Sequence, residues 1–381
     1  MRDIAPFHVM EVQDRAFQLQ AAGRDIVHME IGQPDFGTPP QVVETARQAL
    51  ASQRLGYTSA LGLPELREAI SGFYAKRHGV RVPAERIAVT TGSSGAFLLA
   101  LGALLDPGDE LLLPDPSYPC NRHIARAFEA RTAALPVDHR SHYQPTPEQV
   151  RRAWNRHTRG LVLASPSNPA GTTIGDQELA ALVETVRSLG GFVLVDEIYQ
   201  GLTYGPSPRS ALHLGDDVIV TNSFSKYFSM TGWRLGWAVA PTELVREMEK
   251  LAQNLYVSPP SLSQYAALAA FRDDTLALLD ERRDEFCRRR DFLVPALRDI
   301  GFSVPLLPQG AFYVYAGCER FAGDSQAFAF DLLEQAGVAL TPGIDFGNYR
   351  AAAHVRFAYT CSMDRIEEAL NRLDRRLKSK P

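Results

Sequence analysis

The sequence predicts an α/β protein built around a mostly parallel sheet. Between residues 84 and 240, short runs of β-branched residues and leucine alternate with longer helical stretches, as in successive βαβ units. In Val193-Leu194-Val195 the apolar residues are consecutive, so we expect helices over both faces of that strand. The 381 residues, 45% of them hydrophobic, exceed the usual size of one domain and can form a large core.

Six strands of this sheet are predicted in chain order, each ending in residues that can form a turn. Ligands gather at the carboxyl ends of strands in parallel sheets, so the polar residues after each run are the candidate site residues. The predicted strands are IAVTT at 87–91, ELLLP at 110–114, GLVLAS at 160–165, GFVLVDE at 191–197, DVIVTNS at 217–223 and RLGWAVA at 234–240.

The pattern changes beyond about residue 280, where a charged helix begins. It continues with short strands at 311–315 and 354–359 and an amphipathic helix at 364–378, which predicts a smaller α+β unit. The first forty residues contain no comparable sheet-forming run, and we expect them to pack against this unit and over a cleft. The predicted domains are a large one, 42–280, and a small one, 1–41 with 281–381.

Composition favours a small-molecule partner. The net charge is −4, and the short cluster Arg288, Arg289, Arg290 is the longest basic run, so nucleic-acid binding is not indicated. The N-terminus lacks the apolar core of a secretory signal, and no window reaches the roughly 18 apolar residues that span a bilayer. The four cysteines form no CxxC pair and are expected to be reduced, buried thiols. We expect a cytoplasmic protein.

The segment TGSSGAF at 91–97 joins a predicted strand to a predicted helix. Its glycines allow close approach of the backbone, and the helix N-terminus offers free N–H groups and the positive end of the helix dipole, which suits an anion. The alternative is a simple N-cap. The segment matches neither a Walker A loop nor GxGxxG, which disfavours a P-loop NTPase or a dinucleotide enzyme.

Two further polar residues follow predicted strands. Asp196 comes directly after a buried run and needs a partner, although it would also serve as an N-cap. Asn168 lies in the turn SPSNP, where the alternative is ordinary turn chemistry.

Lys226 and Arg234 place two cations at the same sheet edge. A lysine in a partly desolvated site has a lowered pKa and can form a Schiff base. Together these residues supply the groups that pyridoxal 5′-phosphate requires. They are a loop for its phosphate, a lysine for its aldehyde, an acid for its ring nitrogen, an amide for its phenolic oxygen and an arginine for more of the phosphate charge.

Nine segments in order make the chain resemble the class I and II aminotransferases, which have fold type I of the pyridoxal-phosphate enzymes. The resemblance implies a large domain with a mostly parallel seven-stranded sheet and a smaller α+β domain. The segments are IGQPDFGTP at 31–39, YTSALGLPELREAI at 57–70, TGSSGAF at 91–97, DPSYP at 115–119, SPSNPAGT at 165–172, VDEIY at 195–199, SFSKYFSMTGWRLGW at 223–237, PQGAFYVY at 308–315 and HVRFAY at 354–359.

The resemblance also implies roles around the cofactor ring. Lys226 would form the Schiff base and then move the proton at the substrate's α-carbon. Asp196 would pair with the ring nitrogen, and Asn168 and Tyr199 would hydrogen-bond the phenolic oxygen. Tyr118 would stack on the ring.

For the cofactor phosphate, the family pattern implies Ser93, Ser94, the hydroxyl of Ser223 and a bidentate contact from Arg234. Tyr57 would reach the same phosphate from the neighbouring subunit, which implies a homodimer with shared sites. Its alternative is a core aromatic residue.

For the substrate, Arg356 would hold the α-carboxylate, with the backbone of Gly32 and the amide of Asn168 nearby. Some prokaryotic aspartate-type members have a lysine in the phosphate loop that contacts the second carboxylate, where this chain has Ser94. That contact would then fall to Arg122 or to an arginine of the second subunit. Apolar walls would come from Phe7, Tyr256 and Phe312, whose alternative is an ordinary core role.

The function implied is amino-group transfer from an L-α-amino acid to a 2-oxo acid, with 2-oxoglutarate as acceptor, by a ping-pong cycle through pyridoxamine phosphate. A C–S β-lyase of the same fold uses the same lysine and is the alternative enzyme. A non-catalytic aminotransferase-like regulator is a third hypothesis, disfavoured because the chain is mildly acidic and begins almost directly with the family's N-terminal segment.

Overall fold

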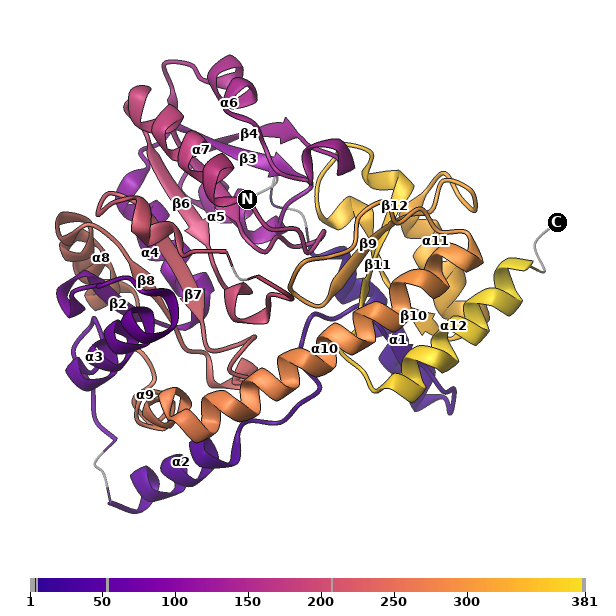
Figure 1. Ribbon diagram of the computed structural model, residues 1–381, viewed down its shortest axis with the longest axis horizontal. Coiled ribbons are helices and arrows are strands. Elements are labelled where there is room, and N and C mark those ends of the chain that lie inside the picture. Colours follow the sequence, from indigo (N-terminus) through magenta and orange to yellow (C-terminus); the bar gives the residue numbers. More distant parts are fainter. Residues whose placement is uncertain (1–3, 5, 53–54, 207, 379–381) are drawn as a thin grey trace.

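A seven-stranded sheet forms the centre of the large unit in the computed structural model, which describes residue 4 and residues 6–52, 55–206 and 208–378 (Figure 1). Four strand pairs are parallel, and β8 is antiparallel to both neighbours. The predicted mostly parallel sheet is therefore confirmed. Across the sheet the order is β2 (Ile87–Thr90), β8 (Gly236–Val239), β7 (Ile219–Ser223), β6 (Phe192–Asp196), β5 (Thr158–Ala164), β3 (Glu110–Asp115) and β4 (Arg131–Pro136).

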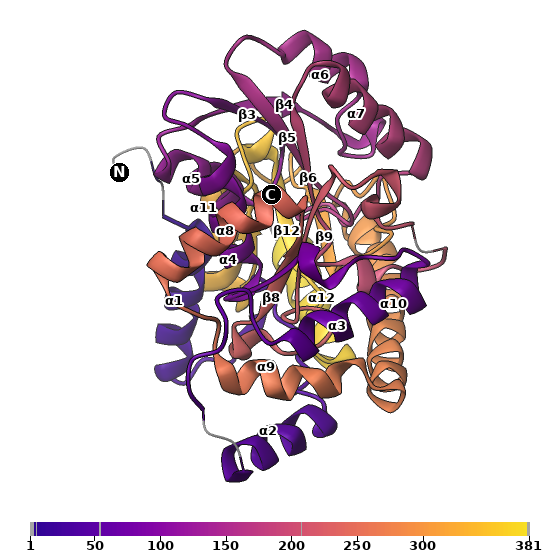
Figure 2. The same ribbon diagram turned by 90° about the vertical axis from the view of Figure 1, so that its left-hand side faces the viewer.

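Helices cover both faces of this sheet, as the consecutive apolar residues indicated (Figure 2). In β5, Leu161 and Leu163 belong to one buried cluster while Val162 belongs to another. The Val162 face packs against α4 (Gly92–Leu104), α5 (Pro119–Ala127) and α8 (Thr242–Leu255). The opposite face packs against α3 (Pro64–Phe73), α6 (Pro147–Ala153), α7 (Asp176–Ser188) and α9 (Ser261–Ala267).

The smaller unit contains a three-stranded antiparallel sheet and a two-stranded parallel one. The former has the order β11 (Thr341–Pro342), β12 (His354–Ala358), β9 (Tyr313–Gly317). The latter pairs β1 (Val27–His28) with β10 (Val338–Ala339), so the N-terminal segment is joined to the C-terminal unit. Its helices are α1 (His8–Ala21), α11 (Ser325–Asp331) and α12 (Met363–Lys378).

One long helix connects the units, and a shorter one packs on the large unit. Helix α2 (Pro40–Ser52) packs on α9, and α10 (Asp273–Ile300) runs from the large unit to the small one (Figure 1). Residue 280, where the domain boundary was predicted, lies within α10. The division into 42–280 and 1–41 with 281–381 stays a prediction.

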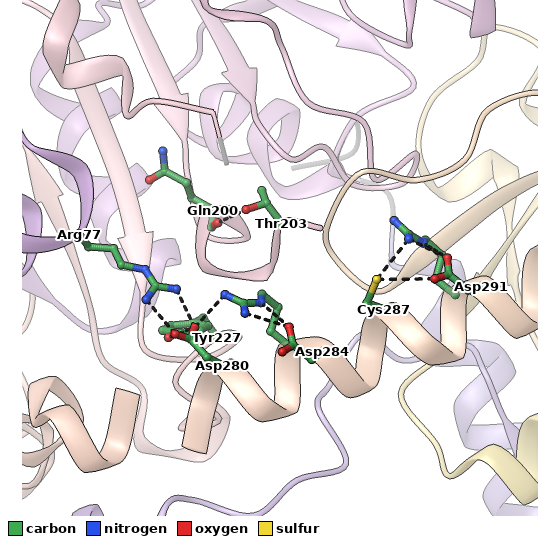
Figure 3. Close-up of polar contacts among 10 residues, drawn as sticks. Arg77, Gln200, Thr203, Tyr227, Asp280, Asp284, Cys287 and Asp291 are labelled. Atoms are coloured by element: carbon green, nitrogen blue, oxygen red, sulfur yellow. Dashed lines mark hydrogen bonds and ion pairs between the residues drawn. The ribbon is translucent and has the colours of Figure 1, made fainter. Parts of the chain in front are cut away.

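Asp280 ties α10 to the large unit (Figure 3). Its carboxylate accepts two hydrogen bonds from Arg77, at 2.9 and 2.6 Å, one from the Tyr227 hydroxyl at 2.8 Å, and one from Arg283 at 3.0 Å. Tyr227 directly follows Lys226, so the loop that holds the predicted catalytic lysine is anchored to a helix shared by both units.

No helix in the described part of the chain is long and apolar enough to cross a membrane.

Candidate active site

A cavity of about 280 Å³ lies at the carboxyl ends of the central strands, facing the small unit. Most of the predicted site residues line it: Gly32, Ser93, Ser94, Tyr118, Asn168, Asp196, Tyr199, Lys226, Arg234 and Arg356.

The sheet topology explains why residues so far apart in sequence meet there. Asp196 ends β6, Lys226 lies three residues after the end of β7, and Asn168 lies four residues after the end of β5. Helix α4 begins two residues after β2, which points the same way as β7 because β8 is antiparallel to both. Parallel strands therefore deliver all four segments to one edge.

Lys226 extends across the cavity to the small unit. Its Nζ donates a 2.6 Å hydrogen bond to the carbonyl oxygen of Gly32. Burial, together with the positive charges of Arg356 and Arg234, lowers its pKa to about 8. The amine is therefore partly neutral near physiological pH, as a nucleophile or general base must be.

Asp196 is buried with no cation hydrogen-bonded to it among the described residues. The hydrogen bonds that it accepts there, from the Ile198 amide and the Thr221 hydroxyl, are both 3.2 Å long and end on Oδ1. Oδ2 is left for a donor in the cavity. Burial raises the Asp196 pKa to about 7, although the two hydrogen bonds and the charge of Lys226 oppose the shift.

The start of α4 and Arg234 form an anion cradle. Ser93 and Ser94 occupy the first turn of the helix, where backbone N–H groups lack intrahelical partners. Gly92 has a φ of +77°, and a Cβ atom there would lie 2.7 Å from Nη2 of Arg234. The guanidinium thus lies against the helix start, and glycine leaves the space that this contact needs.

Arg356 is held rigidly by the residues around it. Nη1 donates to Oδ1 of Asn168 at 2.8 Å, and Nη2 donates to the Glu30 carbonyl at 2.7 Å and the Thr341 hydroxyl at 3.0 Å. The guanidinium carbon lies over two aromatic rings, 4.2 Å from the ring centre of Tyr313 and 4.8 Å from that of Phe346. Its Nε is buried and has no hydrogen-bond partner among the described residues.

The Arg356 environment suits a carboxylate. A buried N–H without a partner costs free energy, and a bound anion would satisfy it. Because the other nitrogens are already fixed by Asn168, Glu30 and Thr341, the guanidinium is preorganised for a ligand.

Aromatic residues form the remaining walls. Phe7 and Tyr118 have ring centres 6.2 Å apart, and both line the cavity. The Tyr199 and Tyr313 hydroxyls are 2.8 Å apart. Tyr313 was not predicted, although it lies in the quoted segment PQGAFYVY and a Cβ atom at Gly32 would come within 1.7 Å of its hydroxyl.

Some sequence predictions do not match the lining of the cavity. Ser223 is buried outside it, where its hydroxyl donates to the Leu235 carbonyl at 3.0 Å and bonds with Ser225, which does line the cavity. Tyr57 is 84% exposed, and its proposed contact with a second subunit stays a prediction.

Two of the three expected apolar walls also lie elsewhere. Phe312 packs beneath the cavity against Tyr199, while Tyr256 packs beside the cluster formed by α4 and α8. Phe7 is the one that lines the cavity. An aromatic residue in a family segment can thus support the wall from behind without lining it, and the sequence does not distinguish these two positions.

The residues present fit pyridoxal 5′-phosphate. The cradle beside Arg234 suits its phosphate, and Lys226 suits its aldehyde. The free Oδ2 of Asp196 suits a protonated ring nitrogen, whose positive charge would offset the cost of burying the carboxylate. Tyr118, Asn168 and Tyr199 line the space between them.

Comparison with known proteins adds independent evidence. Residues 24–373 match the family model described as aminotransferase class I and II. The chain is 41% identical over 372 residues to the valine–pyruvate aminotransferase of Mycobacterium tuberculosis, covering 97% of this chain and 96% of that protein.

Solved structures agree. An aminotransferase from Mycobacterium tuberculosis superposes with a TM-score of 0.96 at 40% identity, covering 100% of this chain and 98% of that one. The aspartate aminotransferase of Thermus thermophilus, solved with maleate, gives a TM-score of 0.93 at 34% identity and covers 98% and 97% of the two chains.

Proposed function

The chain belongs to the family of class I and II aminotransferases, and on that premise we propose that it uses pyridoxal 5′-phosphate to move the amino group of an L-α-amino acid to 2-oxoglutarate in a ping-pong cycle. The observation that carries the proposal is the convergence of Lys226, Asp196 and Arg356 on one cavity. When bound, the cofactor supplies an electron sink for the charge that develops at the substrate's α-carbon.

Arg356 orients the substrate. Its unpaired Nε and its contacts with the rings of Tyr313 and Phe346 favour a carboxylate held in one direction. Orientation matters because the bond at the α-carbon that stands in line with the acceptor orbital is the one that breaks. Fixing the carboxylate therefore selects removal of a proton instead of loss of carbon dioxide.

Lys226 moves that proton. With a pKa lowered to about 8, its amine can take a proton at the α-carbon and return it. The carbonyl of Gly32, 2.6 Å from Nζ, holds the amine near the small-unit side of the cavity. Asp196 would keep the ring nitrogen of the cofactor protonated, because a neighbouring positive charge stabilises its buried carboxylate.

We further propose a cytoplasmic homodimer. The four cysteines are free thiols, which supports a reducing compartment. The exposed ring of Tyr57 supports a contact with a second subunit. Valine, named for the 41% identical relative, is a test donor because Phe7 and Tyr118 give the cavity an apolar wall.

The proposal is tested by adding single L-amino acids to the cofactor-loaded protein and recording its absorbance. Donors should shift the visible band to that of the pyridoxamine form, and 2-oxoglutarate should restore it. A protein that takes up the cofactor but responds to no donor would contradict amino transfer. Release of pyruvate and ammonia from cystathionine without a 2-oxo acid would instead indicate a β-lyase.

A further inference from the structure

Tyr227 directly follows Lys226, but its side chain lies outside the active-site cavity. The ring is buried and packs on the backbone of Gly201, where a Cβ atom would lie 2.4 Å from Cγ of the ring. Gly201 comes two residues after Tyr199, which lines the cavity. The ring of Tyr227 therefore joins the loop of the predicted catalytic lysine to the loop that begins at Tyr199.

The Tyr227 hydroxyl has a charged acceptor on α10. It donates a 2.8 Å hydrogen bond to Oδ1 of Asp280 (Figure 3). The same carboxylate accepts two hydrogen bonds from Arg77 and one from Arg283. A carboxylate held by several donors is fixed in place, and a hydrogen bond to a charged acceptor is stronger than one between neutral groups. Any shift of the Tyr227 ring would break this bond.

The backbone around Lys226 forms a closed turn. The amide of Ser229 donates to the Lys226 carbonyl at 3.1 Å, and the amide of Met230 donates to the Phe224 carbonyl at 3.0 Å. The residues on both sides of the lysine are thus tied to each other. Because the turn is closed, a displacement of the Tyr227 ring must also displace the backbone of Lys226.

Further along α10, two arginines hold the segment that follows Gly32. Nη1 of Arg289 donates to Oδ1 of Asp35 at 2.8 Å, and Arg289 is 4% exposed. The guanidinium carbons of Arg282 and Arg289 each lie 5.2 Å from the centre of the Phe36 ring. Helix α10 therefore contacts the chain three residues beyond Gly32.

We propose that Tyr227 and Asp280 are positioning residues, and that α10 is the rigid spacer that holds Lys226 in place against the Gly32 segment for proton transfer at the α-carbon. Arg289 lies nine residues after Asp280, a rise of about 13 Å in an α-helix. The hydrogen bond from Lys226 Nζ to the Gly32 carbonyl spans the two segments that this helix holds. The inference rests on the proposed function.

Tyr227→Phe removes the hydroxyl and keeps the ring. In the cofactor-loaded variant, kcat for a donor should fall about tenfold, because a misplaced Nζ slows proton transfer, while KM should change less than about twofold. The isotope effect with a donor deuterated at the α-carbon should rise, since proton transfer then limits the rate. Asp280→Asn should act in the same direction, and the two effects should not add, because both act through one hydrogen bond.

The apoprotein gives a second readout that does not depend on turnover. Acetic anhydride modifies only neutral amines, so the pH dependence of Lys226 acetylation, followed by mass spectrometry, measures the pKa of Lys226. In Tyr227→Phe the less fixed amine gains contact with water, and its pKa should rise by at least about 0.5. The charged groups that face Nζ, namely Arg356, Arg234 and Asp196, are the same in every variant.

Tyr143→Phe is the matched control. Tyr143 is 7% exposed, similar to the 3% of Tyr227, and lies outside the active-site cavity. Its variant should keep the wild-type kcat, isotope effect and Lys226 pKa. If Tyr227→Phe does not fold, Asp280→Asn replaces it in both measurements.

Two results would overturn the inference. One is a Tyr227→Phe enzyme that keeps the wild-type kcat, isotope effect and Lys226 pKa, which would make the hydrogen bond to Asp280 purely structural even if thermal stability falls. The other is full additivity of the two variants, which would show that Asp280 does not act through Tyr227. If the wild type converts no donor, the proposed function itself fails, and acetylation of the apoproteins still tests whether Tyr227 positions Lys226.

Discussion

At the scale of single residues, the site depends on charges that burial makes unfavourable. Asp196 is 6% exposed and Arg356 is 5% exposed. Both side chains line the cavity. Among the described residues, Nε of Arg356 has no hydrogen-bond partner, and the hydrogen bonds to Asp196 end on Oδ1. Burying these two charged side chains costs free energy in the apoprotein. Binding of ligand groups of opposite charge offsets that cost.

Asp196 should make the stability of the apoprotein depend on pH. Its pKa is raised from 3.8 to about 7, so between these values the folded state retains a proton that the unfolded state has lost. The free energy of unfolding must then fall as pH rises through this window. Asp196→Asn removes the titration, and the wild type should lose about 2 kcal/mol more than the variant between pH 5 and 7.

Urea denaturation of both apoproteins at several pH values measures this difference. Glu197, whose pKa is raised to about 8 by burial and further by the charge of Asp196, is present in both proteins, so they share its pH dependence except for the part that Asp196 causes. Parallel stability curves for the two proteins would show that Asp196 is ionised in the folded apoprotein.

The residues predicted to act on the cofactor could be found from sequence because each lies in a family segment that directly follows a predicted strand. Asp196, Asn168 and Lys226 each follow an apolar run, so their position at one sheet edge is a consequence of topology. Tyr313 could not be found in this way. It begins strand β9 of the small unit and does not follow an apolar run, and its hydroxyl reaches the cavity because Gly32 leaves room for it.

Ser223 and Ser225 illustrate another limit. They are two residues apart, and sequence alone does not show which hydroxyl faces the cavity. The Ser223 hydroxyl donates to the carbonyl of Leu235, the residue before β8, while Ser225 lines the cavity.

At the scale of elements, the start of α4 should depend on Gly92. With a φ of +77°, alanine there would cost about 1 kcal/mol of stability, and its Cβ atom would displace the Arg234 guanidinium. Gly92→Ala should therefore weaken binding of pyridoxal 5′-phosphate by about tenfold or more, because one charge-assisted contact is lost.

Gly72→Ala is the control for that variant. Gly72 lies in α3, and a methyl group added there would have nothing described within 4 Å, so alanine should leave cofactor affinity unchanged and stabilise the helix by up to about 1 kcal/mol. Titration of each apoprotein with the cofactor gives the dissociation constants. Equal cofactor affinities for the two variants would show that the start of α4 and Arg234 do not form the anion-binding site.

The elements that sequence predicted poorly are those with little apolar patterning. Strand β4 lies at the sheet edge, where only Leu135 among its six residues is buried, and its sequence lacks a run of large apolar residues. Strands β1, β10 and β11 have two residues each and are defined by their partners, not by local sequence.

At the scale of the whole molecule, the proposed dimer makes the two sites depend on each other. If Tyr57 completes the neighbouring site, Tyr57→Ala and Lys226→Ala homodimers should each be impaired, but a hybrid dimer should contain one intact site. After random subunit exchange, about a quarter of all sites should be intact.

Mixing the two purified variants and measuring activity at limiting cofactor concentration tests this. Activity should rise above that of either variant alone as the subunits exchange. If exchange is demonstrated and activity does not rise, Tyr57 acts within its own subunit or not at all.

The arrangement of the two units was predictable from sequence because the family segments come from both of them. Segments from 31–39 to 354–359 place Gly32 and Arg356 in the small unit and the cofactor residues in the large one. A larger cavity beside the active site, of about 660 Å³, was not predictable from sequence, because Phe7, Arg122 and Asp345 come together there only when the N-terminal segment packs against the 345 region.

The central claim is that Lys226 is the residue that joins the cofactor and carries the chemistry. The most direct measurement is to reduce the cofactor-loaded enzyme with borohydride, digest it and locate the pyridoxyl group by mass spectrometry, with Lys226→Ala as the control. We expect the group on Lys226 in the wild type and no specific attachment in the variant. A pyridoxyl group on another lysine, or equal labelling of both proteins, would contradict the account.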